Sequence, residues 1–421
     1  MKRYDTYTES GISWIGKVPS HWEMRKLRQL IELFSDKGHP NEQLLSVVRE
    51  LGVVVRDVDS KEENHNYIPD DLSGYKRIRK GDFAINKMKA WQGSYAVSEH
   101  QGIVSPAYYT CHLRLKNKKF FNIAIRSQAY VPFFTQNSKG IRVGQWDLSP
   151  IGLKEIPFFV PPQEEQEEIV AYLDEKCAQI DRYMASLEER IERLGELRQA
   201  LIAEAVTRGI NPQAPLRPSG IPWLGEIPQH WEMKRLKYLF SERSEKGFPD
   251  EPILCSTQKY GVIPQSMYEN RVVVVNKGLE GLKLVRKGDF VISLRSFQGG
   301  IEYAHYQGII SAAYTILQLN EGANSAYLRY LLKSEPFIQL LQVCVIGIRE
   351  GQNINYSLLR KNFLPVPPQE EQEAIVAYLD EKTTQIDRYT GQLEEMIRQM
   401  KDLRQTIISE AVTGKICVLP N

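Results

Sequence analysis

The chain of 421 residues carries one pattern twice, and this internal repeat limits its possible folds more than any other feature. Residues 10–24 return as residues 219–233, and residues 161–183 return as residues 367–389 with 20 of 23 positions identical. The offset between the copies stays between 206 and 209, so each unit is about half of the chain and not a short solenoid repeat. We therefore expect two halves of similar structure.

Shorter matches recur in the same order, but the sequence between them diverges. The matching pairs are Arg79–Phe83 with Arg286–Phe290, Gln101–Ser105 with Gln307–Ser311, and Gly140–Gln145 with Gly347–Gln352. The last quarter of each unit is nearly unchanged, whereas the first three quarters differ widely, as residues 47–51 and 256–260 illustrate. The two halves are expected to share a scaffold and to present different surfaces.

The nearly unchanged quarter predicts a long helix in each half, over residues 161–208 and 367–413. Each segment opens with two prolines and a run of glutamates, which suit the positive end of a helix dipole, and no later proline interrupts it. Apolar residues then recur every seven positions, as in a coiled coil. The d positions are Leu173, Ile180, Leu187, Leu194 and Leu201 in the first helix, and Leu379, Ile386, Leu393, Met400 and Ile407 in the second.

Five heptads exceed what one globular face usually needs, which disfavours an ordinary amphipathic helix packed on its own domain. Because both helices have the same seam, pairing within the chain is the simplest arrangement. Arg198 and Arg404 occupy equivalent a positions, where they are candidates for fixing the register against facing carboxylates. Residues 209–218 form a linker that begins with glycine and contains three prolines.

The divergent segments, residues 1–160 and 219–366, predict α/β or α+β globular domains. Short β-branched runs such as Val53–Val55 and Val272–Val275 are separated by glycine and proline. Lys80–Ile85 is typical of a turn that enters a strand. Asn324–Gln342 is typical of a helix followed by a second helix that is broken from the first by a proline.

Charge is distributed unevenly although the net charge is only +2. Residues 163–208 hold 12 acidic and 6 basic side chains, and residues 369–413 hold 10 and 5. The remaining residues hold 43 basic and 30 acidic side chains, an excess of +13. Basic surface outside the helices is the electrostatic pattern of a protein that binds a phosphate backbone, unless lysine placement varies here by chance.

Basic, amide and aromatic residues at matching places in the two domains are the candidate DNA contacts. Arg and Lys can bind guanine edges, Gln and Asn can bind adenine edges, and each can also hold phosphates. The candidates are Lys87, Lys89, Trp91, Gln92, Arg142 and Gln145 in the first domain, and Arg295, Gln298, Arg349, Gln352 and Asn353 in the second. For any one of them, a half-buried strand position or a solvated surface charge is an equal alternative. Arg142 and Gln145, and Arg349, Gln352 and Asn353, lie on Gly-rich segments. Their recurrence favours a shared backbone contact or a structural turn over base recognition.

Composition and cysteine placement indicate an ordinary globular protein. Hydrophobic residues make up 42% and charged residues 25%, and no apolar run approaches the ~20 residues that a membrane span needs. The N-terminus lacks the apolar stretch of a signal peptide. Five scattered cysteines without a CxxC pattern argue against a disulfide framework or a zinc site and favour the reducing cytoplasm.

Motifs for methyl transfer, ATP hydrolysis or DNA cleavage are missing. The Pro-Pro pairs are followed by Gln163 and Gln369 and not by an aromatic residue, and no Walker A loop is present. Pro69-Asp70 and Pro249-Asp250 lack a matching carboxylate–lysine pair. We therefore expect no catalytic residue, no cofactor and no metal ion in this chain.

His21 and His230 recur beside Trp22 and Trp231, which favours a packing role over catalysis.

Together, these features resemble the specificity subunits of type I restriction–modification systems. The resemblance rests on the Ile-Pro-x-His-Trp-Glu openings, in which Val18 replaces Ile in the first copy, and on the Gly-x-x-x-Gly-Gln segments. It rests also on Pro-Pro-x-Glu-Glu-Gln-x-x-Ile-Val-x-Tyr-Leu at residues 161–173 and 367–379. It covers nearly the whole chain, and the combined order of the motifs is specific although each alone is weak. That family has two target-recognition domains alternating with two long helices.

The resemblance implies that residues 1–160 and 219–366 each recognise half of a split double-stranded DNA target. It implies that the two helices pack as an antiparallel coiled coil, with residues 414–421 as a tail, and dock two adenine-methyltransferase (modification) subunits. Motor and endonuclease (restriction) subunits would complete the complex. S-adenosylmethionine, ATP and Mg are then expected on the partner subunits.

Two other classes of function remain as alternatives. The chain could itself be a methyltransferase or a nuclease, which the missing motifs disfavour. It could also be a coiled-coil adaptor that binds only proteins, which the +13 excess outside the helices disfavours. DNA binding that weakens with salt would distinguish a DNA-binding subunit from such an adaptor.

Overall fold

A computed structural model describes the chain in two compact units. The described residues are 2–57, 68–140, 146–268, 278–320, 322–346 and 353–419. Unit 1 combines Met1–Leu187 with Glu395–Asn421, and unit 2 is Glu188–Glu394. Each unit therefore holds one divergent domain together with parts of both long helices.

Unit 1 is built on a four-stranded antiparallel sheet in the order β4-β11-β8-β9. These strands are β4 (Ile31–Phe34), β11 (Tyr108–Leu113), β8 (Phe83–Asn86) and β9 (Tyr95–Val97). Further antiparallel pairs are β1 (Tyr7–Glu9) with β2 (Lys17–Pro19), β3 (Glu23–Lys26) with β14 (Pro157–Val160), β5 (Leu45–Val48) with β6 (Gly52–Val55), β7 (Lys76–Ile78) with β10 (Gly102–Val104), and β12 (Ser138–Lys139) with β13 (Asp147–Leu148). The helical elements are α1 (Leu27–Leu30), η1 (Ala90–Gln92), α2 (Lys118–Arg126), α3 (Val131–Gln136) and α4 (Pro150–Glu155). The turn at Lys80–Asp82 enters β8, as the sequence predicts.

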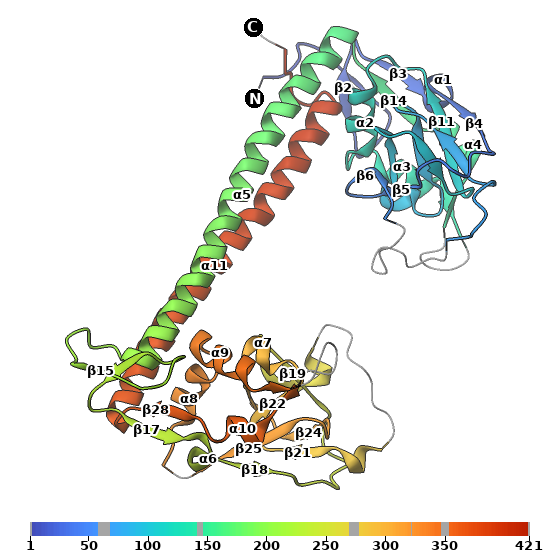
Figure 1. Cartoon of the computed structure of the whole chain (residues 1–421). Helices are drawn as coiled ribbons and strands as arrows, with labels where there is room; N and C mark the ends of the chain where they lie inside the picture. The colour runs from blue at the N-terminus through green and yellow to red at the C-terminus, as the bar shows by residue number, and fades with distance from the viewer. Residues whose placement is uncertain are drawn as a thin grey trace. The chain divides into compact units, whose positions relative to one another are not determined.

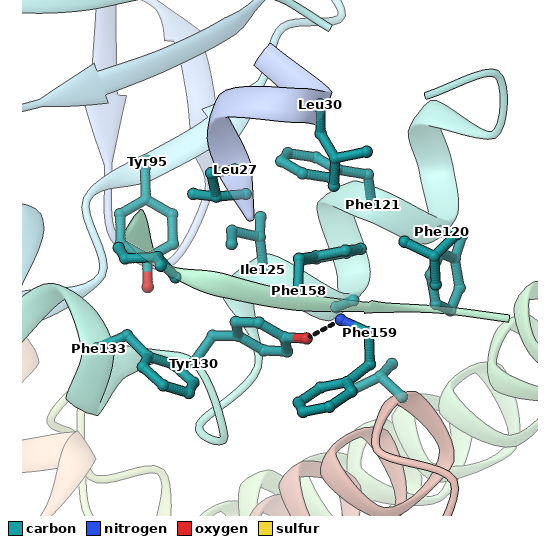
Figure 2. Close-up of a cluster of buried hydrophobic side chains, with 14 of the residues drawn as sticks. Leu27, Leu30, Tyr95, Phe120, Phe121, Ile125, Tyr130, Phe133, Phe158 and Phe159 are labelled. Atoms are coloured by element: carbon teal, nitrogen blue, oxygen red, sulfur yellow. Dashed lines mark hydrogen bonds between the residues drawn. The ribbon is translucent and has the colours of Figure 1, made fainter. Parts of the chain in front are cut away.

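The central sheet of unit 1 is buried on both faces. Alternate side chains of a strand point to opposite faces, so Phe83 and Ile85 join the main core while Ala84 joins a smaller core with the β5–β6 pair. The main core is rich in aromatic rings, and Figure 2 shows Tyr130 accepting a hydrogen bond from the backbone N–H of Phe159 (3.1 Å). This packing fixes one face of the domain against its helices.

Unit 2 repeats this architecture with different side chains. Its four-stranded antiparallel sheet has the order β18-β25-β22-β23. These strands are β18 (Phe240–Arg243), β25 (Thr315–Leu319), β22 (Phe290–Ile292) and β23 (Glu302–Tyr303). The other pairs are β15 (Leu216–Pro218) with β16 (Glu226–Pro228), β17 (Glu232–Arg235) with β28 (Phe363–Val366), β19 (Leu254–Thr257) with β20 (Gly261–Pro264), β21 (Lys283–Val285) with β24 (Gly308–Ile310), and β26 (Val345–Ile346) with β27 (Asn353–Ile354).

The helices of unit 2 match the pattern in its sequence. They are α6 (Leu236–Leu239), η2 (Gln265–Met267), η3 (Leu279–Gly281), α7 (Ser296–Gly299), α8 (Ser325–Leu331), α9 (Glu335–Val343) and α10 (Tyr356–Leu359). The predicted pair of helices over 324–342 is confirmed as α8 and α9, with Pro336 in the first turn of α9. Val272–Val275 lie outside the described residues.

Two long helices, α5 (Gln163–Arg208) and α11 (Gln369–Val412), each begin directly after a Pro-Pro pair and are paired antiparallel in both units (Figure 1). In unit 1, Ile169, Leu173 and Ile180 of α5 share a core with Ile407 and Ala411 of α11. In unit 2, the cluster contains Ile202, Ala205 and Val206 of α5 together with Ile375 and Leu379 of α11. The start of one helix thus packs beside the end of the other.

The predicted seam positions lie on the less exposed side of both helices. Leu173, Ile180, Leu187, Leu379, Ile386 and Ile407 are buried, and Leu194, Leu201, Leu393 and Met400 are half-buried. Arg198 pairs with Asp387 in unit 2, and Arg404 lies 3.5 Å from Asp181 in unit 1. The predicted facing carboxylates are therefore present for both arginines, one pair in each unit.

None of the described helices is both long and apolar enough to cross a membrane. All five cysteines are unpaired thiols, and Cys111, Cys255 and Cys344 are buried.

Candidate nucleic-acid interface

The repeated His-Trp pair fixes each domain to the beginning of a long helix. In unit 1, the buried carboxylate of Glu165 lies 2.8 Å from Nε2 of His21 and accepts hydrogen bonds from Nε1 of Trp22 (2.9 Å) and from Tyr4. Burial, followed by the contact with Glu165, holds the pKa of Tyr4 above its ordinary value. His21 therefore helps to hold the domain against the start of α5.

Unit 2 builds the same anchor from Glu371. Its carboxylate lies 2.7 Å from Nε2 of His230 and accepts from Nε1 of Trp231 at 3.0 Å. The next residue, Gln372, donates from Nε2 to the carbonyl of Pro367 (2.7 Å), and Gln166 does the same to Pro161 (2.8 Å). The Pro-Pro-x-Glu-Glu-Gln motif is thus explained by helix anchoring.

Away from this anchor, each unit has an open cleft between its domain and the end of one long helix. The cleft of unit 1 measures about 380 Å³ and that of unit 2 about 780 Å³. Arg404, Gln405 and Ile408 of α11 line the first, and the equivalent Arg198, Gln199 and Ile202 of α5 line the second. The predicted contacts Gln92 and Gln298 lie in these two clefts, at matching positions. The repeat has therefore placed the same amide twice in equivalent surroundings.

A β-hairpin tip forms one wall of each cleft, and we call these segments tip 1 (residues 49–51) and tip 2 (residues 258–260). Tip 1 joins β5 to β6 and presents Arg49, Glu50 and Leu51; tip 2 joins β19 to β20 and presents Gln258, Lys259 and Tyr260. All six side chains are exposed. The tips thus offer different side chains from one backbone frame.

Both tips pack on a glycine that belongs to the repeat. A Cβ on Gly93 would lie 3.9 Å from Cγ of Arg49, and a Cβ on Gly299 would lie 2.7 Å from Cδ of Gln258. Gly93 also has φ = +94°, a region that L side chains rarely adopt. Gly299 therefore allows tip 2 to approach the turn that carries Gln298. A Cβ on Gly93 would make only an ordinary van der Waals contact with tip 1, and there the positive φ is what favours glycine.

A cation holds the backbone of each tip. In unit 1, Nη2 of Arg126 donates to the carbonyls of Arg49 (2.8 Å) and Glu50 (2.9 Å). In unit 2, Nζ of Lys333 donates to the carbonyl of Gln258 (3.0 Å) and to the buried Glu302 (2.7 Å). Burial lowers the pKa of Arg126 and raises the pKa of Glu302. The tips are thus fixed by their main chains while their side chains stay exposed.

The structure also describes three other predicted contacts of the first domain, namely Lys87, Lys89 and Trp91. Nζ of Lys87 is 3.0 Å from Asp147, so its charge is already partly balanced, whereas Lys89 is exposed. The half-buried ring of Trp91 packs on Trp146 with centroids 5.1 Å apart. Trp91 therefore fits its packing alternative better than base stacking. Arg142 and Gln145 lie outside the described residues.

In the second domain, the structure brings three predicted contacts near one another. Arg295 and Gln298 are exposed at the two ends of α7, which packs against the β27 strand that carries Asn353. Arg349 and Gln352 lie outside the described residues.

Sequence reasoning did not select the tips or the cations that hold them. Divergence between residues 47–51 and 256–260 was the available signal, but it did not show that these segments are exposed turns. Arg126 and Lys333 gave no signal, because their contacts join segments more than 70 residues apart.

The chain is similar to proteins named as specificity subunits of type I restriction enzymes. Residues 228–399 match the family model described as the type I restriction modification DNA specificity domain. The chain is 25% identical to the putative type I restriction enzyme MjaX specificity subunit of Methanocaldococcus jannaschii, over 96% of each chain. It is 20% identical to the EcoKI specificity subunit of Escherichia coli K12, over 95% of this chain and 90% of that one.

A solved structure extends the similarity to the fold. The matching chain belongs to a solved structure described as the structural basis of complex assembly and conformational transition of the type I R-M system. Its TM-score with this protein is 0.63, and the two sequences are 17% identical. The match covers 95% of this chain and 99% of that one. The family model, the relatives that match along nearly the whole chain, the shared fold and the duplicated domain–helix arrangement all agree. The chain is therefore similar, along nearly its whole length, to type I restriction–modification DNA specificity subunits.

Proposed function

We propose that this chain recognises a bipartite double-stranded DNA target and directs adenine methylation and restriction by partner subunits. The observation that carries the proposal is the duplicated cleft, in which one frame presents different exposed side chains in each unit. Recognition of two different half-sites requires this combination of a common frame and distinct contact residues. The excess of +13 outside the helices supplies attraction to the phosphate backbone.

The helices are proposed to dock two methyltransferase subunits, because an exposed apolar pair occurs once in each unit. Tyr183 and Leu403 in unit 1 are 40% and 39% exposed, and Tyr389 and Leu197 in unit 2 are 59% and 49% exposed. All four occupy the same heptad position, and the ion pairs Arg404–Asp181 and Arg198–Asp387 place each pair at one level of the coiled coil. Two equivalent patches favour two copies of one partner.

We further propose that the chain is not an enzyme and carries no cofactor. S-adenosylmethionine is assigned to the methyltransferase subunits, and ATP and Mg to the motor and endonuclease subunits. A cytoplasmic location is proposed as well, with support from the five unpaired thiols. Methyl transfer by the purified chain alone would contradict the first of these assignments.

Methylated adenines mapped in the host genome, with and without this gene, test the central proposal. We expect a bipartite methylated sequence that disappears with the gene. Exchange of residues 219–366 for the domain of another family member should change one half-site and leave the other unchanged. A continuous native site, or an exchange that alters both halves, would overturn the two-domain assignment.

The paired helices are proposed to set the gap between the half-sites. Deletion of residues 187–193 together with residues 392–398 removes one heptad from each helix and keeps both Arg–Asp pairs in register. The helices shorten by roughly 10 Å, so we expect the gap to shrink by about three base pairs at 3.4 Å each. An unchanged gap in a folded, assembled variant would show that the helices do not set it.

A further inference from the structure

We propose that tip 1 and tip 2 enter the DNA major groove and determine the base preference of the two half-sites. The inference rests on the proposed function and narrows it, because it assigns specificity to three residues in each domain. The partner is the base edges of duplex DNA.

The geometry of the hairpins fits this role. β5 pairs with β6, and β19 with β20, as antiparallel ribbons of two strands that are not part of the central sheets. The major groove of B-DNA, about 12 Å wide, admits a two-stranded β-ribbon. The side chains at the tips extend outward, with Leu51 72% and Tyr260 50% exposed.

The side chains differ between the tips in the way that base recognition requires. Tip 1 offers the Arg49 guanidinium, which suits the O6 and N7 acceptors of guanine, and the Glu50 carboxylate, which suits the amino group of cytosine. Tip 2 offers the Gln258 amide at the position of Arg49, and a glutamine suits the N6 and N7 edge of adenine. The same backbone position is thus occupied by groups with different base preferences.

The surroundings hold the tips ready for binding. Arg126 fixes two tip carbonyls in unit 1, and Lys333, itself paired with Glu302, fixes one in unit 2. Because these contacts use main-chain carbonyls, exchange of a tip side chain removes none of their acceptors. A fixed backbone with exchangeable side chains reduces the ordering cost of binding and lets specificity change independently of folding.

The test transfers the side chains of tip 2 onto tip 1. Arg49→Gln, Glu50→Lys and Leu51→Tyr are combined in the full chain, which is expressed with its partner subunits, and methylated adenines are mapped. We expect methylation at the native first half-site to fall about ten- to hundredfold, as for loss of one good base contact, and the second half-site to be retained. A new preference in the first half-site is the positive signature.

A matched control makes the same chemical changes elsewhere in unit 1. Glu23, Met24 and Arg25 on β3 are exposed and include an ion pair like that of Arg49 with Glu50. Glu23→Lys, Met24→Tyr and Arg25→Gln should leave both half-sites as in the native protein. An altered half-site in this control would show that the tip has no special role.

Exchange of residues 219–366 separates failure of the inference from failure of the proposed function. If that exchange changes a half-site but the tip transfer leaves the first half-site intact, specificity lies outside the tips and the inference is wrong. If neither change alters the methylated sequence, the proposed function itself fails.

Discussion

Units 1 and 2 share a frame but stabilise it with different chemistry, and the turn before the central strand shows this best. Asp82 in unit 1 and Asp289 in unit 2 accept the same hydrogen bond from a backbone N–H, that of Arg79 or Arg286 (2.8 Å each). Oδ1 of Asp82 then lies 2.9 Å from Nδ1 of His112, whereas Asp289 is 2.9 Å from Nε of the buried Arg243. The repeat preserves the carboxylate and its turn, whereas the partner side chain differs between the units.

The anchors at the two helix starts differ in a similar way. Glu165 has three side-chain partners and its side chain is 4% exposed, whereas Glu371 has His230 and Trp231 as partners and is 21% exposed. Equivalent residues can therefore contribute unequally to stability, and paired variants measure the difference.

The largest difference between the units is expected in the helix seam. Leu187 in unit 1 is fully buried, and Leu393 in unit 2 is half-buried. Leu187→Asp should lower the free energy of unfolding by at least about 5 kcal/mol, because it removes core contacts and buries a carboxylate. Leu393→Asp should cost about 2 kcal/mol, since water reaches the new charge. Urea denaturation measures both, and equal small effects would exclude Leu187 from a buried seam.

The next effect compares the two turn carboxylates. Asp289→Ala leaves Arg243, whose side chain is 7% exposed, without its main partner and should cost about 4 kcal/mol. Asp82→Ala leaves His112, 50% exposed, which water can solvate, and should cost about 1 kcal/mol. Thermal unfolding of the two variants gives the order. A larger loss of stability in Asp82→Ala than in Asp289→Ala would contradict the greater contribution expected of Asp289.

A smaller difference is expected between the two anchors. Glu165→Ala removes the acceptor for the buried Nε1 of Trp22 and for Tyr4, and should cost about 3 kcal/mol. Glu371→Ala should cost about 2 kcal/mol, because the more exposed site admits water. Tryptophan fluorescence during urea unfolding measures the difference. Tyr4→Phe in unit 1 should reduce the difference in unfolding free energy between the two anchors. If this variant leaves the difference unchanged, Tyr4 is not the cause of it.

The smallest effect is expected for the arginines in the seam. Arg198→Leu and Arg404→Leu replace partly exposed charges by the apolar residue that a seam prefers, so stability should change by less than about 1 kcal/mol or rise slightly. Both variants should become less sensitive to salt. A loss of more than about 2 kcal/mol in the free energy of unfolding would mean that the affected Arg–Asp pair is a main stabilising contact. Unequal losses in the two variants would distinguish the units.

The sequence by itself determined the repeat, the two long helices, their seam and the mixture of helices and strands in the domains. These features depend on local periodicity and on residues near in sequence, so a seven-residue apolar spacing or a Pro-Pro start indicates them directly. The recurrence of His21 and His230 even indicated a packing role, although its partners, Glu165 and Glu371, are more than 140 residues away.

Only the tertiary structure decided which side chains share a cleft. Tip 1 shares a cleft with Gln92, Arg126 and Arg404, and these three residues come from three other distant segments. No local sequence pattern encodes such an arrangement. The structure also placed Trp91 against Trp146 and paired Lys87 with Asp147, so two predicted contacts have partners inside the protein. Packing and charge pairing across long sequence separations depend on the folded backbone as a whole. The residue types could therefore be listed from the sequence, but their neighbours could not.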